Sequence, residues 1–324
     1  MIERRAVTTG LLSIAGAPGI VRGQSPRAMR KIGYLNASSI SPPTATLIIL
    51  RLAWQRLGYV EGETVLLRSA ERDLNRVPSL IAELVDRGCG AIIVVGADAV
   101  KAARKATSTT PIVAIDLETD PVRAGLADSF ARPGGNVTGL FLDLPSLAGK
   151  WVTLMQEVAP SIERIAIGWD PRTGQDQLDV AKGATQSRGV SFVVFETPTY
   201  GDFDAVFERL GDLSQTGAIH LSSPGFSLVA EKFARAAQKH RMPTIAFLKA
   251  YANAGVLMTY GPHHEDYFER AAIIADRIVR GEKAAETPIE QPKKFELVVN
   301  IKTAQSIGLT IPPSILIRAD EVIE

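Results

Sequence analysis

Residues 31–35 read KIGYL and residues 91–95 read AIIVV, and the second half of the chain has the runs RIAIGW at residues 164–169 and GAIHL at residues 217–221. These runs are short and rich in Ile, Val and Leu, which is typical of strands buried on both faces of a sheet. Segments with apolar residues at helical spacing separate them, such as residues 47–57. This alternation predicts parallel sheets covered by helices on both faces.

The strand-like runs occur in the same order in both halves of the chain. They continue at residues 64–70, 112–115 and 137–142 of the first half, and at residues 190–195, 243–246 and 255–258 of the second. The repeated order predicts an α/β protein with two doubly wound parallel-sheet lobes. The alternative is one continuous sheet, but Pro145 and the long helix that follows it favour a break near residue 143.

The last part of the chain indicates how the lobes are joined. A helix expected at residues 263–281 ends at a glycine, and an extended, proline-containing stretch then leads to a further strand. If this helix packs on the first lobe and the strand returns to the second, the chain crosses between lobes three times and forms a three-strand hinge. We therefore expect an N-terminal lobe of residues 30–142 plus 263–284, and a C-terminal lobe of residues 143–262 plus 285–324.

The first residues have the features of an export signal. Arg4 and Arg5 precede a short, weakly apolar stretch, and small residues lie near residue 23. The paired arginines resemble a twin-arginine signal. We expect residues 1–23 to be a signal peptide that directs the chain to the periplasm; the alternative is an N-terminal extension of a cytosolic protein.

Composition excludes several classes of protein. The chain has 324 residues, 46% of them hydrophobic, with 36 Lys plus Arg against 35 Asp plus Glu. A formal net charge of +1 and the lack of a concentrated basic patch argue against a nucleic-acid partner. The one cysteine, Cys89, allows neither an intrachain disulfide nor a cysteine metal cage. We expect a monomer.

Motifs for catalysis, cofactors and metals are absent from the sequence. It has no G-x-S-x-G elbow, no phosphate-binding loop and no H-E-x-x-H helix. Residues 263–266 (HHED) contain metal-capable side chains, but adjacent residues diverge by about 100° on a helix, so a helix start is the better interpretation. We expect no catalytic residue, no metal and no cofactor.

Candidate ligand-binding residues follow the carboxyl ends of the expected strands, where ligands of open α/β sheets bind. They are polar, small or aromatic, and therefore suit a modest organic solute. The candidates are Ser38, Ser39, Gly96, Ala97, Asp98, Asp116 and Thr138 in the first lobe, and Asp170, Ser222, Ser223, Phe247 and Tyr260 in the second. A structural alternative exists for several of them: Ser39, Asp98 and Ser223 suit helix N-caps, and Asp116 and Asp170 suit turns.

Several motifs resemble one protein family. They are ARPGGNVTGL at residues 131–140, LMTYGP at 257–262, IEQPKKFELVVN at 289–300, TIPP at 310–313 and RADEVI at 318–323. This combination resembles the ABC-transporter substrate-binding family that includes tryptophan/tyrosine-type receptors. The resemblance extends from about residue 32 to the C-terminus.

The resemblance implies a type I periplasmic-binding-protein fold. Such a receptor captures a small solute between its lobes and passes it to a membrane permease served by ATPase subunits. Asp98 stands where the family commonly has an uncharged residue, and Asp170–Pro171 replaces the usual Asn-Pro. Their extra negative charge argues against a simple anionic ligand and leaves room for an amine-bearing one.

The expected mechanism is hinge closure, driven by ligand contacts to both lobes. Ser38, Ser39 and Thr138 would form hydrogen bonds, Asp98 or Asp170 would meet a cationic group, and Tyr260 or Phe247 would stack on the ligand. One alternative is a two-lobed α/β enzyme that uses the cleft carboxylates for acid–base chemistry. Another is the sensor core of a transcription regulator, which needs a DNA-binding module; none is expected before residue 32.

Overall fold

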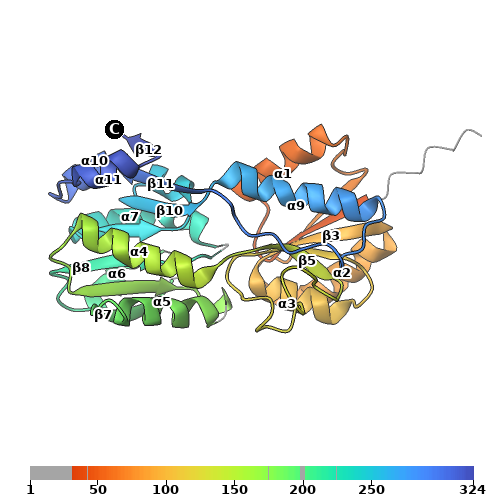
Figure 1. Cartoon of the computed structure of the whole chain (residues 1–324), viewed down its shortest axis with the longest axis horizontal. Helices are drawn as coiled ribbons and strands as arrows, with labels where there is room; N and C mark the ends of the chain where they lie inside the picture. Colours follow the sequence, from red (N-terminus) through yellow and green to blue (C-terminus); the bar gives the residue numbers. More distant parts are fainter. Residues whose placement is uncertain (1–30, 42, 174, 198–200, 224) are drawn as a thin grey trace, which may run out of the picture.

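The computed structural model describes residues 31–324 except 42, 174, 198–200 and 224. The expected signal peptide, residues 1–23, lies outside the described residues. Figure 1 shows two lobes side by side along the longest axis of the molecule, each built on its own sheet. The prediction of two α/β lobes rather than one continuous sheet is therefore confirmed.

The first lobe contains a five-stranded, entirely parallel sheet of strand order β2-β1-β3-β4-β5. Its strands are β1 (Lys31–Asn36), β2 (Val65–Ser69), β3 (Cys89–Val95), β4 (Ile112–Asp116) and β5 (Val137–Phe141). The helices are α1 (Ala45–Arg56), α2 (Val77–Asp86), α3 (Ala97–Ala106) and α9 (His264–Val279), with the 3-10 turn η1 (Leu74–Arg76). Helices α1 and α9 pair on one face and α2 and α3 on the other, so the central strands are buried on both faces.

The second lobe contains a seven-stranded sheet of order β12-β11-β10-β9-β8-β6-β7. Its strands are β6 (Arg164–Trp169), β7 (Ser191–Glu196), β8 (Thr216–His220), β9 (Thr244–Ala246), β10 (Met258–Pro262), β11 (Phe295–Asn300) and β12 (Glu321–Ile323). Strand β11 pairs with β10 in the antiparallel direction, whereas the other pairs are parallel. The chain re-enters this sheet from the other lobe, and that approach reverses the direction of β11.

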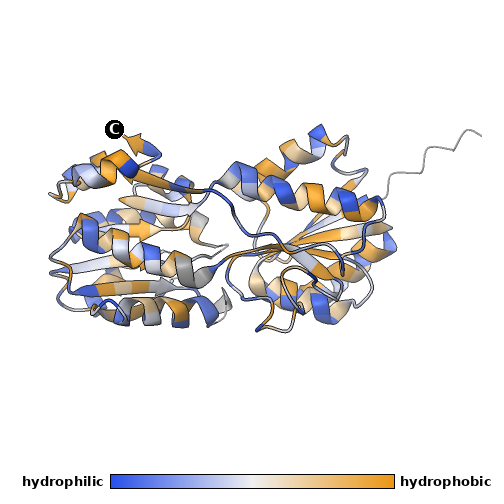
Figure 2. Cartoon of the chain, in the orientation of Figure 1, coloured by the Kyte–Doolittle hydropathy of each residue, from blue (hydrophilic) through white to orange (hydrophobic). Residues whose placement is uncertain are grey.

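Helices cover both faces of the second sheet as well. They are α4 (Leu144–Val158), α5 (Asp176–Gln186), α6 (Phe203–Arg209), α7 (Ala230–Lys239), α8 (Lys249–Asn253), α10 (Ile301–Ser306) and α11 (Pro313–Arg318), with the 3-10 turns η2 (Pro171–Thr173) and η3 (Phe226–Leu228). Figure 2 shows apolar residues concentrated on the strands and on the inner faces of these helices. None of the helices within the described ranges is long and apolar enough to cross a membrane.

Three connections join the lobes. The first links β5 to α4, and the second links β10 of the second sheet to α9, which lies beside α1 on the first lobe (Figure 1). The third runs from α9 back to β11 and lies along β5, where the Glu290 N–H donates to the Gly139 carbonyl and the Phe141 N–H donates to the Glu290 carbonyl. Gly139 has φ +129°, and a Cβ there would lie 2.2 Å from the Ala114 carbonyl oxygen, so only glycine fits this part of the hinge.

Apolar packing is continuous between the lobes. The core on the α1–α9 side of the first sheet, including Tyr34 and Trp54, belongs to the same cluster as the core of the second lobe. The other face of the first sheet, under α2 and α3, has a separate core. The apolar core under α1 and α9 therefore continues into the second lobe, whereas the core under α2 and α3 does not. The expected residue boundaries of the lobes remain a prediction.

Candidate functional site

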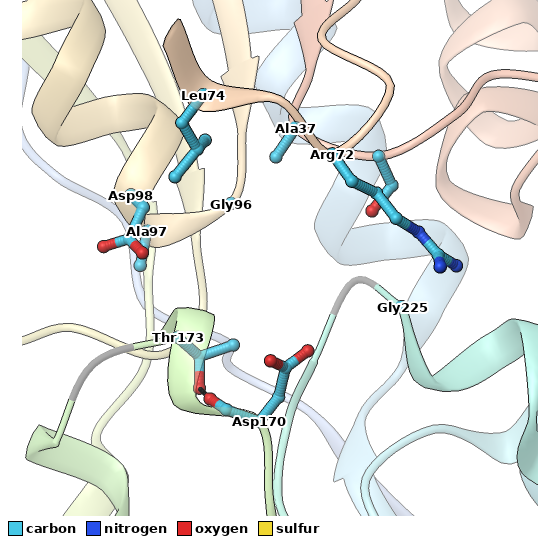
Figure 3. Close-up of a pocket in the computed structure, with 10 residues that line it drawn as sticks. Ala37, Arg72, Leu74, Gly96, Ala97, Asp98, Asp170, Thr173 and Gly225 are labelled. Carbon is cyan, nitrogen blue, oxygen red and sulfur yellow. Dashed lines mark hydrogen bonds between the residues drawn. The ribbon is translucent and has the colours of Figure 1, made fainter. Parts of the chain in front are cut away.

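Two adjacent hollows lie between the lobes, at the carboxyl ends of strands from both sheets. The outer pocket, shown in Figure 3, has Asp98 on one lobe and Asp170 on the other, with Arg72 at its side. Its remaining lining residues are Ala37, Ser38, Leu74, Gly96, Ala97, Thr173 and Gly225. The parallel sheets place these residues together because the ends of their strands face each other across the gap.

The inner cavity adjoins the outer pocket and shares Gly96 with it. The first lobe lines it with Asn36, Thr44, Ala45, Thr46, Val95, Gly96, Ile115, Leu117, Glu118 and Phe268, and the second lobe with Ser222, Ser223, Phe247, Leu248, Ala250 and Tyr251. Glu118 is the one carboxylic acid in this lining, and the Tyr251 phenol is the other group that can lose a proton. Lys, Arg and His are absent from the described lining. The cavity is thus apolar and aromatic with one acid, as is common in pockets for small organic ligands.

Glu118 connects the two lobes across the inner cavity. It is 3% exposed, and its Oε1 accepts a hydrogen bond from the Ser222 hydroxyl of the second lobe at 2.7 Å. Its Oε2 is buried without a hydrogen-bond partner. Buried carboxylate oxygens are nearly always paired, so an unpaired oxygen on a residue that lines a cavity marks a position for a ligand donor.

Asp116 lies two residues before Glu118, at the end of β4, and shapes the turn that presents it. Its Oδ1 accepts hydrogen bonds from the backbone N–H groups of Glu118 at 3.1 Å and Thr119 at 3.0 Å. Its Oδ2 is also buried without a partner. Burial raises the pKa of both carboxyls, and the negative charge of Asp116 raises the pKa of Glu118 further.

The outer pocket brings a second pair of acids toward one another. Asp170, which follows β6, is buried, and its Oδ2 accepts a hydrogen bond from the Ser223 hydroxyl at 2.7 Å. Asp98, in the first turn of α3, has its pKa raised by burial; Lys101 opposes this shift and the charge of Asp170 adds to it. The two carboxylates come from opposite lobes, so approach of the lobes brings like charges together unless a cation lies between them.

Aromatic rings form much of the wall on the second-lobe side. Phe247 packs edge-on against Trp151, with ring centroids 6.4 Å apart, and Tyr251 packs edge-on against Phe226 at 4.7 Å. Phe268 of α9 adds a third ring from the hinge side of the first lobe. Rings held in this way form rigid walls against which an aromatic or aliphatic group of a ligand would pack.

Helix starts supply hydrogen-bond donors to the same region. The inner cavity is lined by Thr44, Ala45 and Thr46 at the start of α1, where the Thr44 hydroxyl accepts from the Leu47 N–H at 3.3 Å. Gly96, with φ +102°, directs the chain from β3 into α3. The free N–H groups of a helix start carry partial positive charge and favour carboxylate or hydroxyl oxygens.

Most of the sequence-predicted candidates line these two hollows. The outer pocket receives Ser38, Gly96, Ala97, Asp98 and Asp170, and the inner cavity receives Gly96, Ser222, Ser223 and Phe247. The N-cap alternative does not hold for Ser39, Asp98 or Ser223: the N-caps are Thr44 for α1, Gly96 for α3 and Gly225 for η3.

The remaining candidates, Ser39, Asp116, Thr138 and Tyr260, do not line either hollow. The Ser39 hydroxyl interacts with the backbone of Ser41, and the Thr138 hydroxyl donates to the Thr287 carbonyl in the hinge at 2.8 Å. The Tyr260 ring stacks on Phe295 with centroids 5.6 Å apart. Asp116 forms the turn anticipated for it and acts on the cavity through Glu118.

Sequence reasoning missed Glu118 and Tyr251. Glu118 stands two positions beyond the last residue of β4, so a search that extended two residues past each strand end finds it. Tyr251 belongs to the short helix α8, and its ring reaches the cavity only because α8 packs against β10 and β11. That packing has no counterpart in the sequence pattern.

Within the part of the chain that the structure describes, no cluster of three or more His, Cys, Asp or Glu side chains is arranged to hold a metal. In the HHED segment, the His263 Nδ1 lies 3.4 Å from the Asp266 Oδ2, which is also 3.1 Å from the Lys294 ammonium. This arrangement is an ion-pair network at the start of α9. The absence of a cofactor remains a prediction.

Comparison with known proteins places the chain in a family. Residues 50–323 match the family model described as ABC transporter substrate binding protein, so the chain belongs to that family. Among curated proteins it is similar to the tyrosine-binding protein of Clostridioides difficile (strain R20291), with 23% identity over 260 residues that cover 78% of this chain and 73% of the relative. The family consists of substrate-binding receptors rather than enzymes.

Solved structures share the fold. A conserved domain protein from Vibrio cholerae aligns with a TM-score of 0.81 and 21% identity, over 91% of this chain and 99% of its own. A domain from Streptococcus pneumonia in complex with L-Trp aligns at 0.78 and 23% identity, over 90% and 100%. A ligand-free, open substrate binding protein from Clostridium difficile aligns at 0.62 and 20% identity, over 91% and 99%. The predicted fold class and family resemblance are confirmed.

Proposed function

We propose that this chain is the extracytoplasmic solute receptor of an ABC importer, which captures an amino acid or a related aromatic or carboxylic compound between its lobes. The observation that carries the proposal is the inner cavity, where a buried Glu118 with an unpaired oxygen faces three aromatic rings. A permease and its ATPase subunits would receive the solute. The receptor itself would make and break no covalent bond of the solute.

The chemistry of the lining favours a ligand with an amine and an apolar or aromatic body. Glu118 offers an acceptor to an ammonium group, and Asp98 and Asp170 add negative charge in the outer pocket. The start of α1 suits a carboxylate, and Phe247, Tyr251 and Phe268 suit a ring. Tyrosine and tryptophan, the ligands in the descriptions of two similar proteins, have these three parts.

Hinge closure is the proposed mode of capture. Direct contacts between the lobes support it: Ser222 with Glu118, and Arg123 with Asp176 at 3.6 Å. The TM-score is 0.78 to the complex with L-Trp but 0.62 to the ligand-free, open protein, at 23% and 20% identity, which is consistent with a closed arrangement of the lobes here. A ligand that contacts both walls stabilises this state in proportion to its differential affinity.

Export by the twin-arginine route to the periplasm is the proposed location. It rests on Arg4 and Arg5 and on the short apolar stretch that follows them. Changing both residues to lysine would leave the charge intact but remove the motif. We expect that double variant to remain in the cytoplasm while the unaltered chain is recovered from the periplasm, as measured by cell fractionation.

A two-lobed acid–base enzyme is the second candidate, because a buried carboxyl of raised pKa is also a feature of catalytic acids. The two candidates differ in the fate of the ligand. A receptor returns its ligand unchanged when it is denatured, whereas an enzyme returns a product. Mass spectrometry of the released compound distinguishes them.

Calorimetric titration tests the receptor proposal. The panel contains L-tyrosine, L-tryptophan, tyramine, tryptamine, the corresponding des-amino acids and a ureido compound, and scattering measures the radius of gyration with and without each. We expect binding and a smaller radius for amine-bearing members. Silence across the panel with no change in radius would contradict the proposal.

A further inference from the structure

Two buried acids lie close together in the chain at the first-lobe side of the inner cavity, which Glu118 lines and Asp116 does not. Asp116 is 0% exposed and Glu118 is 3% exposed, and they are separated by a single residue. Each has one oxygen with a partner, and each has one buried oxygen without a partner, Oδ2 of Asp116 and Oε2 of Glu118. Such a pair is under-satisfied as two carboxylates, because each unpaired anionic oxygen has lost its hydration.

The groups around the pair do not neutralise two negative charges. Lys101 of α3 acts on Asp116 from a distance, while its side chain is 37% exposed and its ammonium lies 3.9 Å from the Asp98 carboxylate. Tyr251 of α8 and Tyr267 of α9 face the pair as neutral phenols, whose pKa values burial raises further. Ser222 contributes one hydroxyl from the second lobe, and the backbone N–H groups of Leu117 and Ala97 lower the pKa of Glu118 without carrying a full positive charge.

Electrostatic repulsion and burial determine the protonation state of the Asp116–Glu118 pair while the inner cavity is empty. Two adjacent buried carboxylates repel each other, and burial disfavours each charge, so the pair reduces its energy by retaining a proton. Glu118 is the better holder, because the charge of Asp116 adds to burial in raising its pKa, whereas burial is opposed at Asp116 by the N–H groups of Glu118 and Thr119 and by Lys101. A protonated Glu118 keeps one oxygen as an acceptor for Ser222 and presents an O–H on the other.

We propose that the Asp116–Glu118 pair holds one proton while the inner cavity is empty and releases it to solvent when the ammonium group of a ligand enters beside Glu118. This inference rests on the proposed receptor function and specifies how the receptor recognises its substrate class. The O–H bond of the Glu118 carboxyl breaks, the proton passes to water or buffer, and the ligand cation takes over the compensating charge. The acid pair with its proton, and the ionised pair with the ligand ammonium, therefore carry the same net charge.

Proton exchange makes recognition selective for charge. A ligand with an ammonium group replaces the proton and forms an ion pair with the ionised acids. A neutral ligand of the same shape leaves the proton in place and gains no ion pair. The receptor would thus discriminate tyramine or L-tyrosine from the des-amino acid by far more than shape allows, because a charge-assisted bond in a dry site is much stronger than a neutral one.

The exchange also sets the direction of the pH dependence. The bound state holds one proton fewer than the free state, so affinity rises as pH rises toward the pKa of Glu118, which is raised to about 8, and becomes flat above it. The limiting slope is about tenfold per pH unit. Affinity falls again only when the ligand ammonium loses its own proton.

Calorimetry in two buffers measures the released proton directly. Tyramine and L-tyrosine are titrated at pH 7 in phosphate and in Tris, which differ in their enthalpy of ionisation. We expect close to one proton released per ligand bound, and none in Glu118→Gln. Glu208→Gln, which alters an exposed glutamate on α6, is the matched control and should release the same proton as the unaltered chain. Binding of either ligand without proton release would overturn the inference and leave the receptor function intact.

The protonation of Glu118 can also be measured in the ligand-free protein. Carbon NMR of carboxyl-labelled Glu and Asp should show one carboxyl that titrates above pH 7 and disappears in Glu118→Gln. In Asp116→Asn, removal of the neighbouring charge should lower that pKa toward the usual range. If every carboxyl titrates below about pH 5.5, as ordinary Asp and Glu do, the inference is wrong. No binding across the whole panel would instead contradict the receptor function.

Discussion

The first lobe buries the Asp116–Glu118 pair, and the second lobe buries His220, yet the two sites have opposite characters. Both lie at the carboxyl end of a central strand, β4 and β8. Every polar atom of His220 is paired: its Nδ1 donates to the Leu221 carbonyl at 2.8 Å, and its Nε2 accepts from Thr197 at 2.8 Å. The acid pair has two unpaired oxygens. A satisfied buried group serves the fold, whereas an unsatisfied group beside a cavity serves a ligand.

The two sites also respond to pH in opposite directions. Burial lowers the pKa of His220 to about 3, below the 6.5 of a free histidine. Stability from His220 is therefore present at neutral pH and is lost as pH falls. Burial raises the pKa of the acid pair, so its contribution favours the folded state at low pH and is lost as pH rises.

The largest expected effect comes from the aromatic cluster around His220. Phe233 is fully buried and contacts Phe195, Phe203, Phe207 and Phe226. We expect Phe233→Ala to lower the free energy of unfolding by about 3–5 kcal/mol, because it removes a ring and leaves a cavity. Chemical denaturation measures the loss. A loss below about 1 kcal/mol would mean that the second lobe does not depend on this cluster.

Acid should destabilise the protein through His220. Between pH 6.5 and pH 4 the unfolded chain binds a proton that the folded chain does not, so we expect the free energy of unfolding to fall by about 3 kcal/mol. Denaturation curves at a series of pH values test this. The glutamine side chain of His220→Gln does not titrate, so in this variant the free energy of unfolding should fall less steeply with decreasing pH. An unchanged slope would mean that other groups cause the pH dependence.

Loss of the Ser222 hydroxyl should weaken closure to a smaller degree. Ser222→Ala removes the hydrogen bond to Glu118 that joins the lobes. One such bond contributes about 1 kcal/mol, which corresponds to about a fivefold loss of ligand affinity. Calorimetry with L-tyrosine provides the value. Equal affinity in the variant would show that the contact contributes nothing to the closed state.

The smallest effect is expected at Ser39. Its hydroxyl interacts with Ser41 and lines neither hollow, unlike Ser222. Ser39→Ala should change affinity by less than about twofold. The pair Ser39→Ala and Ser222→Ala thus compares a serine outside the cavity with one inside it by the same chemical change. A larger loss at Ser39 would extend the binding surface beyond the two hollows.

Much of the fold was predictable from local pattern. Apolar runs such as those of β3 and β6 are buried on both faces, as their composition predicts, because the period of side chains along a strand is a local property. The antiparallel direction of β11 was not predictable, since it depends on the side from which the chain returns after α9. The candidates that line the hollows lie just past the ends of β1, β3, β6, β8 and β9, as Ser222 does after β8.

The candidates that the structure places elsewhere have a common physical reason. Thr138 lies within β5 at the hinge, where the third connection supplies a closer acceptor, and Tyr260 has Phe295 beside it on β11. Thr287 is more than a hundred residues from Thr138 in the chain, and Phe295 is several tens of residues from Tyr260. Neither contact can be predicted from a local sequence period. Asp116 forms the turn after β4, and Glu118, two residues later, lines the cavity instead.

Period, composition and motif spacing are properties of neighbouring residues, and they were sufficient to establish the α/β class, the two similar lobes and the family of this chain. The burial of Glu118, its hydrogen bond to Ser222 and the rings around it depend on two lobes meeting at one place. Residues more than a hundred positions apart determine whether a carboxyl there is hydrated, paired or protonated. That environment sets its charge, and only the tertiary structure decided it.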